Sequence, residues 1–256
     1  MGLFDFFRKK QQSEIAQGEQ ATKGYFGDLE KTNQIYHLIS VPARERDDKW
    51  KESFLENIVQ ASFRCGDPQV ITGPDSFPYV QLMMPVPNQS FQCYVIDKMK
   101  DDFLLERGYG VVINPDAGQP DWVLSYGDIV NLNLNGSFYT GGTTAFSAEK
   151  EDETIEGEEN VLVGQPSDLI LSVLNRKVLR EFLISQGVSS PKVFLMSRTI
   201  SNGDVSQELV FNLTPASFPS EEVFRSVMQN IGWFLPHHYS FVGMNEDRFN
   251  DSFMPL

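Results

Sequence analysis

The stretch KVFLMSRTISNGDVSQELVFNL, residues 192–213, decides the fold class of the second half of the chain. Residues 192–196 and 208–213 are mostly apolar runs with the length and composition of β-strands. Between them, residues 201–204 (Ser-Asn-Gly-Asp) are of the types that tight turns prefer. The stretch therefore predicts a β-hairpin.

Helical patterns flank this hairpin on both sides. Upstream, apolar residues recur at helical spacing over residues 169–183, with Ser167 as the predicted N-cap and Gly187 as the C-terminal stop. Downstream, Ser220 precedes an amphipathic helix whose acidic first turn is favoured at the positive end of a helix dipole. Two short strands are predicted at residues 161–163 and 239–242. This order of elements predicts an antiparallel or mixed sheet with helices on one side.

The first half of the chain mixes helices and strands in the same way. One helical pattern begins at Asp28 and stops at Pro42, and a second begins at Asp47 or Asp48 and ends at Gly66. Strands are predicted at residues 70–72, 79–84, 91–96 and 110–113.

Two more helices are predicted before residue 140. A short one runs through residues 101–105 and ends at Gly108. The other begins at Ser125 and Asp128, which form a capping-box pair, and ends near Gly136.

The sequence thus predicts an α+β protein with two small domains, each a mixed or antiparallel sheet with helices packed on it. A chain of 256 residues suits this division, because domains usually hold ~100–200 residues. The predicted division is a flexible leader at residues 1–22, an N-terminal domain at 23–147, an acidic linker at 148–159 and a C-terminal domain at 160–256.

Acidic residues exceed basic ones by 35 to 21, which gives a net charge of -14. Residues 149–159 alone contain seven acids and one lysine. A negative surface repels the phosphate backbone, so nucleic acid is not expected as a partner. It attracts positive surfaces, so we expect another protein, preferably a basic one, as the partner. The predicted acidic surface comprises Glu151, Asp152, Glu153, Glu156, Glu158 and Glu159.

No apolar stretch reaches the ~18 residues that a membrane span needs, which excludes an integral membrane protein. The apolar residues 3–7 precede three cations, whereas a secretory signal has the reverse order. Two cysteines are too few for a disulfide framework. The cytoplasm is therefore the expected compartment, and a peripheral membrane contact through residues 3–10 is an alternative.

Reactive residues are scarce. The chain has three histidines, at His37, His237 and His238, and two cysteines, at Cys65 and Cys93. None of them falls into a metal-ligand spacing, so neither a metal ion nor a cofactor is expected. A hydrolase that pairs one of the cysteines with one of the histidines is the alternative to a binding protein.

Aromatic segments are the candidate binding surface. Trp233 is followed closely by His237, His238 and Tyr239, and Trp122 lies in the first half of the chain. Tryptophan and tyrosine often anchor protein partners, so these five residues are the predicted binding residues. A homodimer is an open alternative.

Several short motifs, in order, resemble the SseB (enhanced serine sensitivity) family. In the first half they are residues 77–80 (Phe-Pro-Tyr-Val), the predicted strand 91–96, residues 110–115 (Gly-Val-Val-Ile-Asn-Pro) and residues 126–129 (Tyr-Gly-Asp-Ile). In the second half they are residues 163–166 (Val-Gly-Gln-Pro), the predicted helix that ends at Gly187 and the strand 192–196. The resemblance implies two α+β domains in a soluble bacterial protein without assigned catalytic residues.

The first helices and the acidic run depart from that family, which leaves a specialised role open. Together, the charge, the predicted core and the lack of a catalytic motif predict a non-enzymatic, protein-binding chain of an accessory or immunity type.

Overall fold

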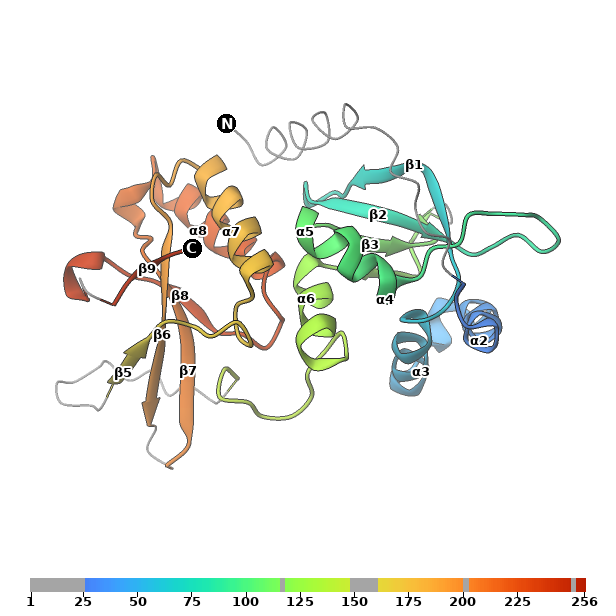
Figure 1. Ribbon diagram of the computed structural model, residues 1–256, viewed down its shortest axis with the longest axis horizontal. Helices are drawn as coiled ribbons and strands as arrows, with labels where there is room; N and C mark the ends of the chain where they lie inside the picture. The colour runs from blue at the N-terminus through green and yellow to red at the C-terminus, as the bar shows by residue number, and fades with distance from the viewer. Residues whose placement is uncertain (1–25, 116–117, 148–160, 200–202, 250–251) are drawn as a thin grey trace. The chain divides into compact units, whose positions relative to one another are not determined.

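The computed structural model describes residues 26–115, 118–147, 161–199, 203–249 and 252–256 (Figure 1). The chain divides into two compact units, called here the N-terminal unit (described from residue 26 to 138) and the C-terminal unit (residues 139–256). In the described residues, the first unit holds a four-stranded sheet and the second a five-stranded one. Both sheets are mixed, and both units contain helices, which confirms the predicted α+β class.

The first helical pair of the N-terminal unit begins where the sequence predicts. α2 (Leu29–Ile39) is capped by Asp28, whose carboxylate accepts hydrogen bonds from two backbone N–H groups of the first turn. α3 (Asp48–Ile58) is capped by Asp47, which accepts from the backbone N–H of Trp50.

The predicted end of the second helix at Gly66 is wrong. α3 ends at Ile58, and Gly66 lies inside β1 (Arg64–Thr72). Long-range pairing overrides the local stop signal: β1 pairs antiparallel with β2 (Pro78–Met83), and Phe63 exchanges two backbone hydrogen bonds with Tyr94.

The sheet of the N-terminal unit has the order β1-β2-β3-β4. β2 runs parallel to β3 (Gly110–Ile113), so the chain must cross over between them. The crossover contains α4 (Ile96–Met99), a π-helical turn and α5 (Leu105–Arg107), which Gly108 ends with a positive φ of 72°. β4 (Trp122–Leu124), which the sequence analysis missed, pairs antiparallel with β3.

The strand predicted at residues 91–96 is absent. Phe91 is exposed, Tyr94 forms only an isolated bridge with Phe63, and Ile96 already belongs to α4. The apolar residues at the end of this stretch are explained by a helix and not by a strand: the buried Val95 and Ile96 pack at the start of α4.

The capping-box prediction is confirmed. α6 (Tyr126–Asn135) begins with reciprocal hydrogen bonds between Ser125 and Asp128, and Gly136 follows it in the left-handed conformation. The hydroxyl of the buried Tyr126 donates to the carbonyl of Leu105, which fixes α6 against α5.

The C-terminal unit is built on the predicted hairpin. β6 (Lys192–Thr199) and β7 (Val205–Phe211) pair antiparallel, from Val193 opposite Phe211 to Thr199 opposite Val205. β5 (Val161–Gly164) pairs with β6, and β8 (Phe241–Gly243) lies parallel to β7. The predicted strand at residues 239–242 is therefore present but begins at Phe241, and a further short strand, β9 (Met254–Pro255), pairs with β6.

Two helices accompany this sheet, α7 (Val173–Ser185) and α8 (Glu221–Trp233), and Figure 1 shows them together on one side of the strands. Ser220 caps α8 as predicted. On the opposite face, a cluster of buried residues includes Phe194, Val210 and Phe253. The predicted sheet with helices on one side is confirmed for this unit.

The predicted cap of α7 is wrong. Ser172, and not Ser167, caps this helix by accepting a hydrogen bond from the backbone N–H of Asn175. Residues 167–171 instead form a turn in which the carbonyl of Ser167 accepts two backbone hydrogen bonds. Gly187 stops the helix as predicted, with a φ of 94°.

Residues 139–147, which the sequence analysis places in the N-terminal domain, group with the C-terminal unit. The backbone N–H of Gln207 donates to the carbonyl of Ala145, and the ring of Phe146 stacks on that of Tyr239. The predicted leader (residues 1–22) and acidic run (149–159) lie outside the described residues. Over the described ranges, the helices are too short or too polar to cross a membrane.

Candidate functional site

The aromatic segment that follows α8 is held against the beginning of α7. Trp233 ends α8 and is half-buried, whereas the next residue, Phe234, is fully buried with its ring 4.8 Å from that of Phe182. The side-chain amide of Asn175, in the first turn of α7, donates to the backbone carbonyl of Phe234 at 3.2 Å. The end of α8 and the start of α7 are therefore neighbours.

Tyr239 makes the second connection between these segments. Its hydroxyl donates to the carbonyl of Ile170 at 3.0 Å, and its ring stacks on Phe146 at 4.3 Å between centroids. Burial raises the pKa of Tyr239 to about 12, so the hydroxyl keeps its proton and remains a donor at neutral pH. Tyr239 thus positions the turn at residues 167–171.

The two adjacent histidines have different surroundings. His238 is half-buried and lies edge-on to the rings of Phe146 and Tyr239. This burial lowers its pKa, which favours the neutral imidazole. His237 is exposed, with its ring 5.6 Å from that of Tyr139. Of the two, His237 is the more exposed, and His238 mainly supports the segment.

Two large apolar side chains project into solvent beside this segment. Leu169, in the turn that Tyr239 holds, is 83% exposed, and Val173, the first residue of α7, is 65% exposed. The sequence analysis placed both within the apolar pattern of a longer helix that begins after Ser167. The signal it missed was Ser172, whose choice as the N-cap leaves Leu169 outside the helix. We call Leu169, Val173, Trp233 and His237 the α7 docking surface.

Trp122, the fifth predicted binding residue, lies in the other unit. It is half-buried on β4, and its ring is 6.1 Å from that of Trp50 and 5.9 Å from that of Phe54 on α3. These contacts pack α3 against the sheet. The predicted residues therefore fall into two groups, one in each unit.

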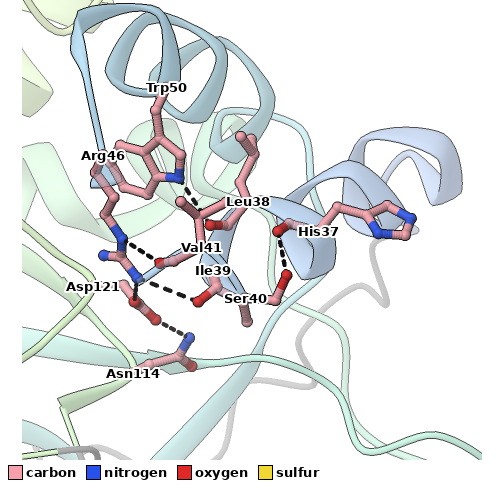
Figure 2. Close-up of polar contacts among 9 residues, drawn as sticks. All are labelled: His37, Leu38, Ile39, Ser40, Val41, Arg46, Trp50, Asn114 and Asp121. Carbon is pink, nitrogen blue, oxygen red and sulfur yellow. Dashed lines mark hydrogen bonds and ion pairs between the residues drawn. The ribbon is translucent and has the colours of Figure 1, made fainter. Parts of the chain in front are cut away.

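A polar network continues from this aromatic cluster (Figure 2). The guanidinium of Arg46 lies over the ring of Trp50 at 4.5 Å and forms an ion pair of 2.7 Å with Asp121. It also donates to the carbonyls of Ile39 and Val41, at the end of α2. Arg46 therefore connects both helices to the segment that enters β4.

Asp121 extends the network to the sheet. Its second oxygen accepts from the side-chain amide of Asn114 at 2.7 Å, and the amide oxygen of Asn114 accepts from the backbone N–H of Met84. Trp50 donates from its indole to the carbonyl of Leu38. These contacts use the polar groups for internal bonding, which is typical of a structural network.

Cys65 lacks the properties of a catalytic thiol. It lies on β1, and not at the end of the second helix, where the predicted stop at Gly66 would have placed it. Burial raises its pKa to about 11, although a hydrogen bond from Tyr94 opposes this. Since the thiolate is the nucleophile, the raised pKa keeps this thiol in its unreactive, protonated form at neutral pH.

The second cysteine and the third histidine add no reactive pair. The thiol of Cys93 has a weak contact of 4.0 Å with the carbonyl of Tyr94. His37 is exposed on α2, and Figure 2 shows its imidazole pointing away from the other residues drawn. Within the described ranges, no hydrogen bond joins a thiol to an imidazole, and no group of three or more His, Cys, Asp or Glu side chains could hold a metal ion.

Comparison with known proteins does not identify a functional site, so the choice of the candidate site rests on the structure. No protein-family model, no curated protein and no solved structure matches the chain. The α7 docking surface is therefore the candidate functional site on the strength of its exposed apolar residues and of the contacts that position them.

Proposed function

We propose that this chain is a cytoplasmic protein-binding protein of the accessory or immunity type, and that it binds a basic partner through its C-terminal unit. The observation that carries the proposal is the exposure of Leu169 and Val173 at the start of α7, in the segment that two hydrogen bonds join to the aromatic segment after α8. Large exposed apolar side chains often mark a protein interface.

The contacts around this surface support a preformed site. The Tyr239–Ile170 and Asn175–Phe234 hydrogen bonds hold its two segments together in the free protein. A surface that is already ordered loses less conformational entropy when a partner binds. The surface is therefore suited to recognition without a large rearrangement.

Charge supports a basic partner. The net charge of -14 attracts positive surfaces over several ångströms and speeds their encounter. The acidic residues 149–159 contribute -6 of this charge, from seven acids and one lysine. The motifs that resemble the SseB family motivate the accessory role.

The test is affinity capture with the full-length chain as bait in cytoplasm from its own organism. We expect Leu169→Asp and Val173→Asp to lose a captured protein that the unchanged chain retains. Ile184→Asp is the matched control, because Ile184 is also exposed and lies near the other end of α7. Circular dichroism checks that each variant is folded.

A result that contradicts the proposal is judged against the control variant. If all three variants and the unchanged chain capture the same proteins, the α7 docking surface does not bind the partner. If the captured protein is not basic, the proposed partner class is wrong even where the surface is right.

A further inference from the structure

β5 lies at an end of the C-terminal sheet. Its four residues pair with β6 in continuous register, from Val161 opposite Arg198 to Gly164 opposite Leu195. Among the described residues, no strand pairs with its other edge. Alternate residues of a strand direct their N–H and C=O groups to opposite sides, so two of the four residues offer these groups to the open edge.

The strand is anchored by one side chain and exposes the next two. Val161 packs against the buried cluster that contains Phe194 and Val210. Leu162 is 73% exposed and Val163 is 40% exposed, and successive side chains of a strand point to opposite faces. Both faces of the sheet therefore present an apolar side chain at this edge.

The other edge strands are less suited to pairing. β1 is long, but its register shifts between Cys65 and Val70, and Pro68 within it has no N–H to donate. β4 and β8 contain only three residues each. Natural proteins protect edges with bulges, prolines, lysines and short strands, and β5 (Val-Leu-Val-Gly) has no bulge, proline or lysine.

We propose that β5 accepts an extended, basic segment of another protein as an added β-strand. Backbone hydrogen bonds to the open edge provide the affinity, and apolar side chains of the added strand contact Leu162 and Val163. This site is separate from the α7 docking surface and does not depend on it.

Charge selects the partner. The chain carries -14, and residues 149–159, with seven acids and one lysine, directly precede β5 in the sequence. A second copy of this chain would bring the same negative charge to the edge, whereas lysines or arginines of a partner are attracted. A basic strand is therefore the favoured occupant.

The test uses a synthetic peptide about eight residues long that alternates lysine and valine, a length typical of a strand. We expect the peptide to bind the full-length chain in calorimetry and to shift the backbone amide NMR signals of residues 161–164. A peptide with glutamate in place of lysine, and one with N-methylated backbone amides, should each bind about tenfold more weakly or worse, because the first is repelled and the second cannot donate to the edge.

Variants of the chain provide the second arm. Leu162→Lys should weaken binding of the lysine–valine peptide about tenfold, because it replaces an apolar contact with a like charge. Val205→Lys is the matched control, since Val205 is exposed on β7 of the same sheet, and it should leave binding unchanged.

Four results would overturn the proposal. They are no binding of the lysine–valine peptide, equal binding of the N-methylated peptide, self-association of the chain through the same amides, and loss of peptide binding in Leu169→Asp. The comparison of the three peptides uses the unchanged chain, so its outcome does not depend on whether any variant folds. If Leu169→Asp no longer captures the partner but still binds the peptide, the result concerns the proposed function and leaves the β5 proposal unaffected.

Discussion

Glu246 shows how one carboxylate stabilises the C-terminal unit. It accepts hydrogen bonds from the ammonium of Lys192 and from the side-chain amide of Asn212, both at 2.6 Å. These contacts stabilise the charged form, so they lower the pKa of Glu246 below its usual value. The residue thus connects the segment after β8 to the beginning of β6 and the end of β7.

A lowered pKa predicts a specific pH dependence. The charged Glu246 stabilises the fold above the pKa of the unfolded state, about 4.3, and this contribution is lost as the pH falls through the lower pKa of the folded state. We therefore expect Glu246→Gln to be less stable than the unchanged chain at pH 7 and the difference to shrink at acidic pH. Denaturant unfolding at a series of pH values measures this.

Asp247→Asn is the control for that experiment, because Asp247 is the next residue and its exposed side chain accepts a hydrogen bond from the side-chain amide of Asn245. Its stability should follow that of the unchanged chain across the pH range. A Glu246→Gln curve that runs parallel to the unchanged one at all pH values would contradict the assignment.

Arg46 and Asp121 form a largely buried ion pair that several neighbours support. Removal of one partner leaves a charge without compensation in a protein interior. We expect Asp121→Ala to lower the free energy of unfolding by about 2–3 kcal/mol, because Arg46 and Asn114 both lose a partner. Chemical denaturation of the purified variant measures the loss.

The exposed pair of Arg44 and Glu45 provides the matched control. Exposed ion pairs contribute little, so Glu45→Ala should change stability only slightly. Equal effects of the two substitutions would show that the Asp121 network does not stabilise the N-terminal unit.

At the scale of elements, the start of α7 decides what the docking surface contains. Ser172 caps the helix, and this leaves Leu169 in a turn and Val173 at the first helical position. We expect Ser172→Ala to destabilise the protein by about 1 kcal/mol, because the N–H of Asn175 loses its acceptor. Thermal or denaturant unfolding checks this value.

Ser167→Ala distinguishes the predicted start of the helix at Ser167 from the observed start at Ser172. Ser167 acts through its backbone carbonyl, which an alanine keeps, so this substitution should leave stability nearly unchanged. A larger loss in Ser167→Ala than in Ser172→Ala would mean that the helix begins at the earlier serine.

At the scale of the whole molecule, the net negative charge is the property that we expect to govern how fast a basic partner associates. With a net charge of -14, attraction of a basic partner should weaken as salt is added, because exposed charges are screened beyond about 10 Å at 0.1 M ionic strength. We expect the association rate with the captured partner to fall steeply with rising salt and the dissociation rate to change less. Surface plasmon resonance at several salt concentrations measures both, and an association rate independent of salt would contradict electrostatic attraction.

Local sequence signals predicted the elements well where neighbouring residues complete them. The Ser125–Asp128 capping box, the Asp47 and Ser220 caps and the Gly136 and Gly187 stops all act within one turn of a helix. The error at Ser167 arose because a second serine nearby, Ser172, caps the helix instead. The errors at Gly66 and at residues 91–96 arose because pairing between distant segments, such as Phe63 with Tyr94, overrides the local pattern.

By itself, the sequence determined the α+β class, the hairpin of β6 and β7 and the acidic character of the chain, because composition and short-range periodicity are enough for these. Only the tertiary structure decided that β2 and β3, and β7 and β8, pair in parallel and that β5 is the terminal strand of its sheet among the described residues. It also decided that Leu169 is exposed while Tyr239 supports it. The physical reason is that these contacts join residues far apart in the chain, and an apolar residue has the same local pattern whether a distant segment covers it or leaves it in solvent.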